Sequence, residues 1–96
     1  MNITEFTNLP NVNNSKSGIY VIFNTENDKL YIGSAVNLSR RRVHHLNHLK
    51  RGIHANQHLQ RAYNKYSKDV FHFKVLEYVE DTNLLVVHEQ IWINKF

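Results

Sequence analysis

Apolar residues alternate near the start of the chain in a way that is typical of paired strands. Residues 17–23 divide between two faces, with Tyr20 and Ile22 on one face. The other face carries Ile19, Val21 and Phe23. A second run covers residues 30–33, and turn-forming residues separate the two runs. The pattern predicts adjacent antiparallel strands, a geometry that brings Tyr20 and Tyr31 close together.

The middle of the chain has the three-to-four-residue spacing of two amphipathic helices. Asn37 or Ser39 can cap a helix that runs to about Lys50. Its predicted apolar arc consists of Leu38, Val43, Leu46 and Leu49. A second helix covers roughly residues 56–66, with Gln60 on its polar side. Its apolar face consists of Leu59, Ala62, Tyr63 and Tyr66.

The last third of the chain predicts a strand and then a helix. Residues 70–79 alternate, and one face carries Phe71, Phe73 and Val75. Asp81 or Thr82 can cap a helix that continues to the end of the chain. The elements together predict an α+β fold, a small three-stranded antiparallel sheet flanked by three helices. We expect residues 1–16 to be an N-terminal extension and residues 17–96 to be one domain.

Charge is distributed unevenly along the chain. The net charge is +4, yet no Asp or Glu lies between Lys29 and Lys68, where nine Lys and Arg and five of the seven histidines are found. A solvated helical face normally mixes both signs, so this block favours a basic surface for a polyanion.

Composition excludes several classes of protein. The chain has no cysteine, which rules out disulfides and thiolate metal sites. Its apolar runs are too short to span a bilayer, and its start lacks the apolar stretch of a secretory signal. We expect an intracellular protein, in the cytoplasm or an organelle, that does not act at a membrane. The sequence implies no protein partner.

Glu89 stands out because it lies on an apolar helical stripe between Leu85 and Trp92. A carboxylate there is unfavourable unless it is paired or binds a cation. One interpretation is a buried salt bridge, for which Arg41 is a candidate partner. The other is a divalent metal ligand, since Mg²⁺ typically takes one or two carboxylates plus water and phosphate oxygens.

Arg41 and His45 are four residues apart, so they share one helical face at the edge of the apolar arc. A guanidinium suits phosphate because its fork donates two parallel hydrogen bonds and keeps its charge. Histidine pairs at the same spacing raise a competing zinc hypothesis: His44 with His48, and His54 with His58. No metalloprotease motif accompanies these pairs.

Several stretches together resemble the GIY-YIG nuclease family, and most closely the catalytic domains of its intron-encoded homing endonucleases. The matching stretches are Ser17-Gly18-Ile19-Tyr20, Tyr31-Ile32-Gly33-Ser34-Ala35, Leu59-Gln60-Arg61 with Asn64-Lys65, and Glu89 with Trp92-Ile93. The resemblance covers residues 17–96. It implies a DNA endonuclease that depends on Mg²⁺, with Mn²⁺ as a substitute, and that acts on double-stranded DNA.

The resemblance also implies roles for individual residues. Tyr20 would activate the attacking water and Tyr31 would orient that water or the phosphate. Arg41 would stabilise charge on phosphorus, His45 would shuttle a proton or contact phosphate, and Glu89 would bind the metal. Further candidates for contacts with DNA are Arg40, Arg42, His54, Arg61 and Lys65.

Two other functions are compatible with the same residues. One is a non-catalytic nucleic-acid-binding module, and the other is a repair or restriction nuclease of the same family. The family usually places an asparagine shortly after its last catalytic helix, and this sequence stops before that point. We therefore expect a longer polypeptide with a DNA-binding region downstream.

Overall fold

Strand β1 (Gly18–Asn24) lies at the centre of a three-stranded sheet in this computed structural model, which describes residues 6–27, 29–66 and 68–96. It pairs antiparallel with β2 (Leu30–Ala35) on one side and with β3 (Phe71–Tyr78) on the other. The hairpin and the α+β class predicted from the sequence are confirmed. In the register, Tyr20 faces Gly33 on β2 and Val75 on β3.

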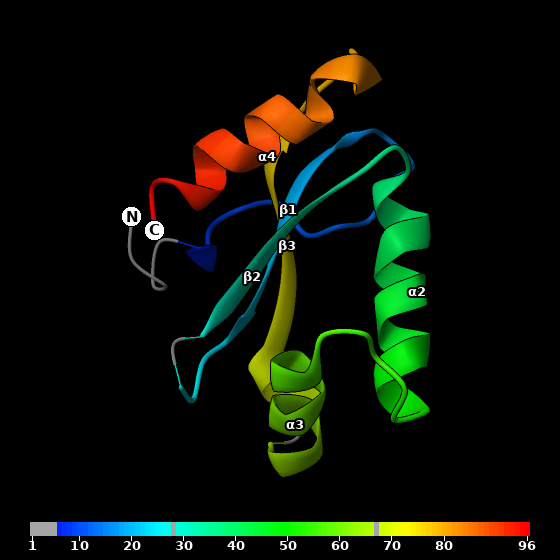
Figure 1. The fold of residues 1–96 in the computed structure, drawn as a ribbon, viewed down its shortest axis with the longest axis vertical. Helices are drawn as coiled ribbons and strands as arrows, with labels where there is room; N and C mark the ends of the chain where they lie inside the picture. Colours follow the sequence, from blue (N-terminus) through cyan, green and yellow to red (C-terminus); the bar gives the residue numbers. More distant parts are fainter. Residues whose placement is uncertain (1–5, 28, 67) are drawn as a thin grey trace.

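Helices cover both faces of this sheet (Figure 1). Helices α2 (Leu38–Lys50) and α3 (Gln57–Lys65) pack on the face that carries Tyr20 and Ile22. Helix α4 (Leu85–Ile93) packs on the opposite face, over Ile19. This arrangement follows the predicted alternation on β1, although both faces of the strand are buried because it is central. None of the helices among the described residues has the length and apolar character needed to cross a membrane.

A side-chain cap and a glycine determine where α2 begins and ends. The side chain of Asn37 accepts a hydrogen bond from the backbone N–H of Arg40 at 3.0 Å and so caps the first turn. At the other end, Gly52 has a positive φ of 73°, which is why a glycine ends the helix. The backbone N–H of Ile53 then bonds to the carbonyl oxygen of His48 at 3.0 Å. Asn56 caps α3 in the same way, by accepting from the N–H of Leu59 at 3.0 Å.

The predicted apolar arc of α2 is wrong at one position. Val43 is 50% exposed, whereas Leu38, His45 and Leu49 are buried. Because successive residues are 100° apart, a helix that buries His45 turns Val43 to the opposite side. The buried stripe therefore runs through a polar histidine, and hydropathy alone placed that histidine at the rim.

The last predicted helix is shorter than expected. A 3₁₀ turn, η2 (Thr82–Leu84), precedes α4, and α4 ends at Ile93 instead of continuing to the end of the chain. Asp81 does cap a first turn, since its side chain accepts from the N–H of Asn83 at 3.0 Å, but that turn is the 3₁₀ segment. Another 3₁₀ turn, η1 (Lys68–Val70), precedes β3.

Residues of the expected N-terminal extension contribute to the core. Residues 1–5 lie outside the described residues, but Phe6 is fully buried, with its ring 5.5 Å from that of Phe23. Further along, Val12 is 5% exposed and donates its backbone N–H to the carbonyl oxygen of Phe73. The N–H of Val75 in turn donates to the carbonyl oxygen of Pro10 at 2.8 Å. The segment therefore runs beside β3 as part of the fold.

Candidate active site

Tyr20 lies at the centre of the candidate site because β1 is central and its ring faces α2. The residue is 3% exposed. A Cβ added at Gly33, directly across on β2, would stand 2.5 Å from Tyr20 Cζ, so only glycine leaves room for the ring. Tyr31 lies on the same face, and the two tyrosine rings are 6.4 Å apart. The sequence-based prediction that these two phenols meet is confirmed.

Two histidines extend this cluster away from Tyr20. His45, buried on α2, has its Nε2 atom 2.6 Å from the Tyr20 hydroxyl oxygen. Its Nδ1 atom lies 2.7 Å from Nε2 of His54, whose ring is stacked on that of His45 at a centroid distance of 5.0 Å. The three side chains form one hydrogen-bonded row, which we call the His54–His45–Tyr20 relay.

The direction of the hydrogen bonds in this relay follows from its far end. The backbone N–H of Asn56 donates to Nδ1 of His54 at 3.0 Å, so that nitrogen carries a lone pair and the proton of neutral His54 is on Nε2. His54 therefore donates to Nδ1 of His45. Neutral His45 then carries its proton on Nε2 and donates to the Tyr20 hydroxyl. The relay makes Tyr20 an acceptor and leaves its own O–H proton available to another partner.

Electrostatics keep both histidines neutral. Burial, assisted by His54 and Arg41, lowers the pKa of His45 to about 4. Burial and the neighbouring His48 also lower the pKa of His54. The pKa of the Tyr20 hydroxyl is raised, mainly by burial and then by Tyr31. A tyrosinate at this position therefore needs positive charge nearby.

Arg41 and Glu89 act on the same hydroxyl from opposite directions. The charge of Arg41 lowers the pKa of Tyr20, and the charge of Glu89 raises it. Arg41 is exposed and lines an open hollow beside Ala35 at the end of β2, together with Arg40. Glu89 is half-buried on α4. Among the described residues no ion pair joins Glu89 to Arg41, so the buried salt bridge considered from the sequence does not form.

Gln60 is a residue of this site that the sequence pattern assigned to the polar side of its helix. It is 8% exposed. Its Oε1 atom accepts from the backbone N–H of His54, and its Nε2 atom donates to the carbonyl oxygen of Leu49, each at 3.0 Å. A further bond reaches Asn64 at 3.0 Å. Gln60 thus ties the segment that carries His54 to the end of α2. The sequence feature that could have pointed to this role is the position of Gln60 in the stretch Leu59-Gln60-Arg61, which resembles the family.

The remaining basic candidates are dispersed. Arg42 lies over the ring of Phe73 at 5.9 Å, away from the hollow that Arg40 lines. Arg61 and Lys65 are exposed on α3. Both ring nitrogens of His54 have protein partners. The structure therefore brings His54 into the relay and Arg40 beside Arg41, and it leaves Arg42, Arg61 and Lys65 outside that hollow.

The structure gives little support to a zinc site. The rings of His44 and His48 lie 4.0 Å apart. Within residues 6–27, 29–66 and 68–96, however, no group of three or more His, Cys, Asp or Glu side chains could hold a metal ion.

An acid–base contact joins α4 to β3 outside the candidate site. Nδ1 of His88 lies 3.0 Å from Oε1 of Glu77. This contact lowers the pKa of Glu77 and helps to hold α4 against β3.

Glu89 is the side chain that fits a divalent metal. A carboxylate supplies the hard oxygen that Mg²⁺ prefers, and a single protein carboxylate is enough when phosphate oxygens and water complete the coordination. Its charge already reaches the Tyr20 hydroxyl. Glu89 is therefore the candidate metal ligand that the chemistry of the side chains favours.

Comparison with known proteins gives consistent matches. Residues 16–96 match the GIY-YIG catalytic domain family. The chain is 40% identical over 81 residues to intron-associated endonuclease 1 of Enterobacteria phage T4, covering 83% of this chain and 33% of that protein. It is 36% identical over 87 residues to a probable intron-encoded endonuclease 1 of Neurospora crassa, covering 84% of this chain and 27% of that protein.

Solved structures show the same similarity in three dimensions. The catalytic domain of homing endonuclease I-TevI superposes with a TM-score of 0.77 and 38% identity, covering 83% of this chain and 87% of that one. A mutant of that domain gives a TM-score of 0.76 at the same identity, covering 83% of this chain and 82% of that one. The chain spans between about a quarter and a third of the length of the curated relatives it matches.

Proposed function

The chain belongs to the GIY-YIG family, and from that premise we propose that it is the catalytic domain of a homing-type endonuclease that hydrolyses phosphodiester bonds in double-stranded DNA. We propose Mg²⁺ as its cofactor, with Mn²⁺ as a substitute. Water attacks phosphorus and leaves a 5′-phosphate and a 3′-hydroxyl. This proposal places the chain inside the cell, where DNA is found.

One observation carries the proposal: the Tyr20 hydroxyl lies 2.6 Å from Nε2 of His45, and the charges of Arg41 and Glu89 act on its pKa in opposite directions. Removing a proton from an unperturbed phenol at neutral pH costs about 4 kcal/mol, and burial adds to this cost. The N–H that His45 donates and the charge of Arg41 both stabilise the phenolate. Tyr20 first loses its O–H proton to solvent, and the phenolate so formed can then take a proton from the attacking water.

The other residues divide the remaining work. Tyr31 lies beside Tyr20, where it orients the water or the phosphate. Arg41 stabilises the charge that builds up on the phosphate oxygens in the transition state. Glu89 holds the divalent cation, which when bound supplies Lewis-acid stabilisation of the phosphate oxygens. His54 positions His45, and Gln60 positions His54.

Contacts with the DNA backbone outside the reacting phosphate fall to exposed basic side chains. We assign this role to Arg40, beside Arg41, and to Arg42, Arg61 and Lys65 on neighbouring surfaces. Such contacts give affinity without sequence information. The basic block between Lys29 and Lys68, which has no acidic residue, supports this assignment.

Supercoiled plasmid tests the proposal directly. The protein should nick the plasmid with Mg²⁺ and not in excess chelator. Arg41→Ala and Glu89→Ala should each lower the nicking rate by about 10²–10³-fold, as expected when a fixed charge stabiliser is removed. Arg51→Ala and Glu80→Ala are matched controls, because both residues are exposed. Their rates should stay close to wild type.

Two results would contradict parts of this assignment. Wild-type nicking by either Arg41→Ala or Glu89→Ala, in a protein with native circular dichroism, removes that residue from the mechanism. DNA binding that falls steeply with salt, with no nicking in any divalent ion, would instead identify a non-catalytic binding module.

A further inference from the structure

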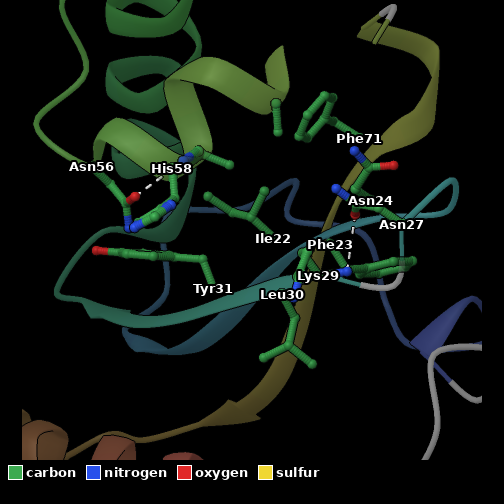
Figure 2. A pocket seen from close by; sticks show the side chains of 12 residues that line it. Ile22, Phe23, Asn24, Asn27, Lys29, Leu30, Tyr31, Asn56, His58 and Phe71 are labelled. Carbon is green, nitrogen blue, oxygen red and sulfur yellow. Dashed lines mark hydrogen bonds between the residues drawn. The ribbon is translucent and has the colours of Figure 1, made fainter. Parts of the chain in front are cut away.

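A cavity of about 380 Å³ opens between the distal end of the β1–β2 hairpin, the start of α3 and the start of β3 (Figure 2). Ile22, Leu59 and Phe71 contribute apolar walls. In Figure 2, Tyr31 lies near Asn56 and His58 toward one end, and Asn24 lies near Phe71 toward the other. Its volume is at the lower end of the roughly 300–1,000 Å³ typical of small-ligand sites.

This cavity lies on the same face of the sheet as the candidate active site. Side chains alternate along a strand, so Tyr20, Ile22 and Asn24 point the same way from β1. Tyr31 belongs to both places, because it lines the cavity and its ring lies 5.7 Å from that of His45. At about 3.3 Å per residue, Tyr20 and Asn24 are separated by roughly 13 Å along the strand.

Asn24 presents a buried donor that lacks a partner. The residue is 2% exposed, and its Oδ1 atom accepts from the backbone N–H of Glu26 at 2.7 Å. That bond fixes which end of the amide is oxygen, so the other end is the NH₂ group. Within the described part of the chain, Nδ2 has no hydrogen-bond partner. A buried donor left unpaired costs about 1–3 kcal/mol, and this cost is relieved if the amide of Asn24, a residue that lines the cavity, turns toward an acceptor supplied by a ligand.

We propose that this cavity binds a nucleobase of the DNA substrate, unstacked from the duplex next to the scissile phosphate. Asn24 Nδ2 donates to a carbonyl oxygen or ring nitrogen of that base. Tyr31 and Phe71 offer aromatic surface for its rings, and Lys29 at the cavity margin offers a cation for the adjoining phosphate. Proteins that bind an extruded base combine aromatic or apolar contacts with hydrogen bonds in this way. The inference rests on the proposed endonuclease function.

In this proposal the end of the hairpin holds a base, a role separate from the hydrolysis of the phosphodiester bond. The reacting phosphate is handled by Tyr20 and its neighbours, while the base beside it is held further along β1. Unstacking a base costs a few kcal/mol, and least where the base is mismatched or weakly paired. The cavity would therefore favour cleavage where the base next to the cut carries a suitable acceptor and leaves its stack easily.

The experiment uses duplexes with 2-aminopurine at each position flanking the mapped nick, since this base becomes brighter when it is unstacked. Binding is measured without divalent metal, so that no cleavage occurs. The wild-type protein should raise the fluorescence at one position. Ala62→Leu adds a side chain at a position that lines the cavity, and Asn24→Asp keeps the acceptor for Glu26 but removes the donor. Gln57→Leu, at an exposed position on the same helix, is the matched control.

Both cavity variants should lose the fluorescence increase, and the control should keep it. Asn24→Asp should nick normal duplex about tenfold more slowly, the usual effect of one hydrogen bond. On a duplex that is abasic at the responding position, Asn24→Asp and wild type should nick equally, because no base remains to be held. A merely structural role of Asn24 would slow both duplexes alike. Thermal unfolding of each variant reports its fold.

Different results overturn the two proposals. If the protein nicks DNA but no flanking position brightens, or if Ala62→Leu brightens like wild type, the base-binding cavity is wrong and the endonuclease assignment stands. If Asn24→Asp slows nicking of normal and abasic duplexes equally, the base-binding cavity is also wrong and the endonuclease assignment again stands. If the wild-type protein nicks no DNA with Mg²⁺, the proposed function fails and the cavity proposal fails with it.

Discussion

Acid should destabilise this fold through His45 in a way that can be calculated from its surroundings. The pKa of His45 is about 4 in the folded protein, mainly because the ring is buried, against 6.5 for an ordinary histidine. Between these values the unfolded chain binds more protons than the folded one. The contribution of neutral His45 to the free energy of unfolding is therefore fully present above about pH 6.5 and is lost as the pH falls toward 4.

The size of the effect follows from the same two pKa values. Lowering the pH from 7.5 to 5 should reduce the free energy of unfolding by about 2 kcal/mol through His45 alone. For a domain of this size, that loss should lower Tm by about 10 °C. His54, whose pKa is lowered in the same direction, adds to the effect. Arg41 opposes protonation of His45 as well, so the loss does not depend on a single neighbour.

Urea denaturation at pH 7.5 and pH 5 measures this loss, and His45→Gln isolates it. Glutamine has an amide that can still reach Tyr20 but does not titrate. The variant should be less stable than wild type at pH 7.5 and should lose about 2 kcal/mol less on acidification. An equal loss in both proteins would refute the reasoning. So would an NMR titration in which the His45 ring protons shift near pH 6.5.

Two packing predictions follow from the same site. Gly33→Ala should slow nicking at least tenfold and cost about 1–3 kcal/mol of stability, because the new methyl group collides with the Tyr20 ring. Ser34→Ala is its control. A wild-type nicking rate in Gly33→Ala would contradict the close contact. Gln60→Leu should cost about 1–3 kcal/mol in urea denaturation, because it leaves the backbone N–H of His54 unpaired, whereas the carbonyl oxygen of Leu49 still accepts from the N–H of Gly52. Asn64→Ala, which removes only one partner of Gln60, should cost much less, and a similar loss in both variants would contradict this role.

The sequence predicted the parts of the fold that depend on local patterning. Alternation along β1 and turn residues after it were enough to place Tyr20 beside Tyr31. Side-chain caps also placed the start of α2 correctly, because Asn37 acts on its own helix. Each of these features depends on residues close in the chain, where propensity and periodicity carry the information.

Long-range polar contacts could not be predicted in the same way. His45 and Gln60 are buried because partners on other segments satisfy their hydrogen bonds, and hydropathy treats both as surface residues. Val43 was misplaced for the same reason, since burial of His45 turns it outward. Asn24, one of the turn-forming residues between the two predicted strand runs, is buried at the end of β1, and its NH₂ group has no hydrogen-bond partner among the residues that the structure describes.

Phe6 gives this scaffold an anchor outside the stretch that matches the family. Its ring contacts Phe23 on the central strand and lies 5.4 Å from that of Phe96, so residues ninety positions apart in sequence meet over one corner of the sheet. The family match begins only at residue 16. Trimming the protein to that boundary would remove the Phe6 ring from its contacts with Phe23 and Phe96, so the heat tolerance of this domain should depend in part on a residue that the family match does not include.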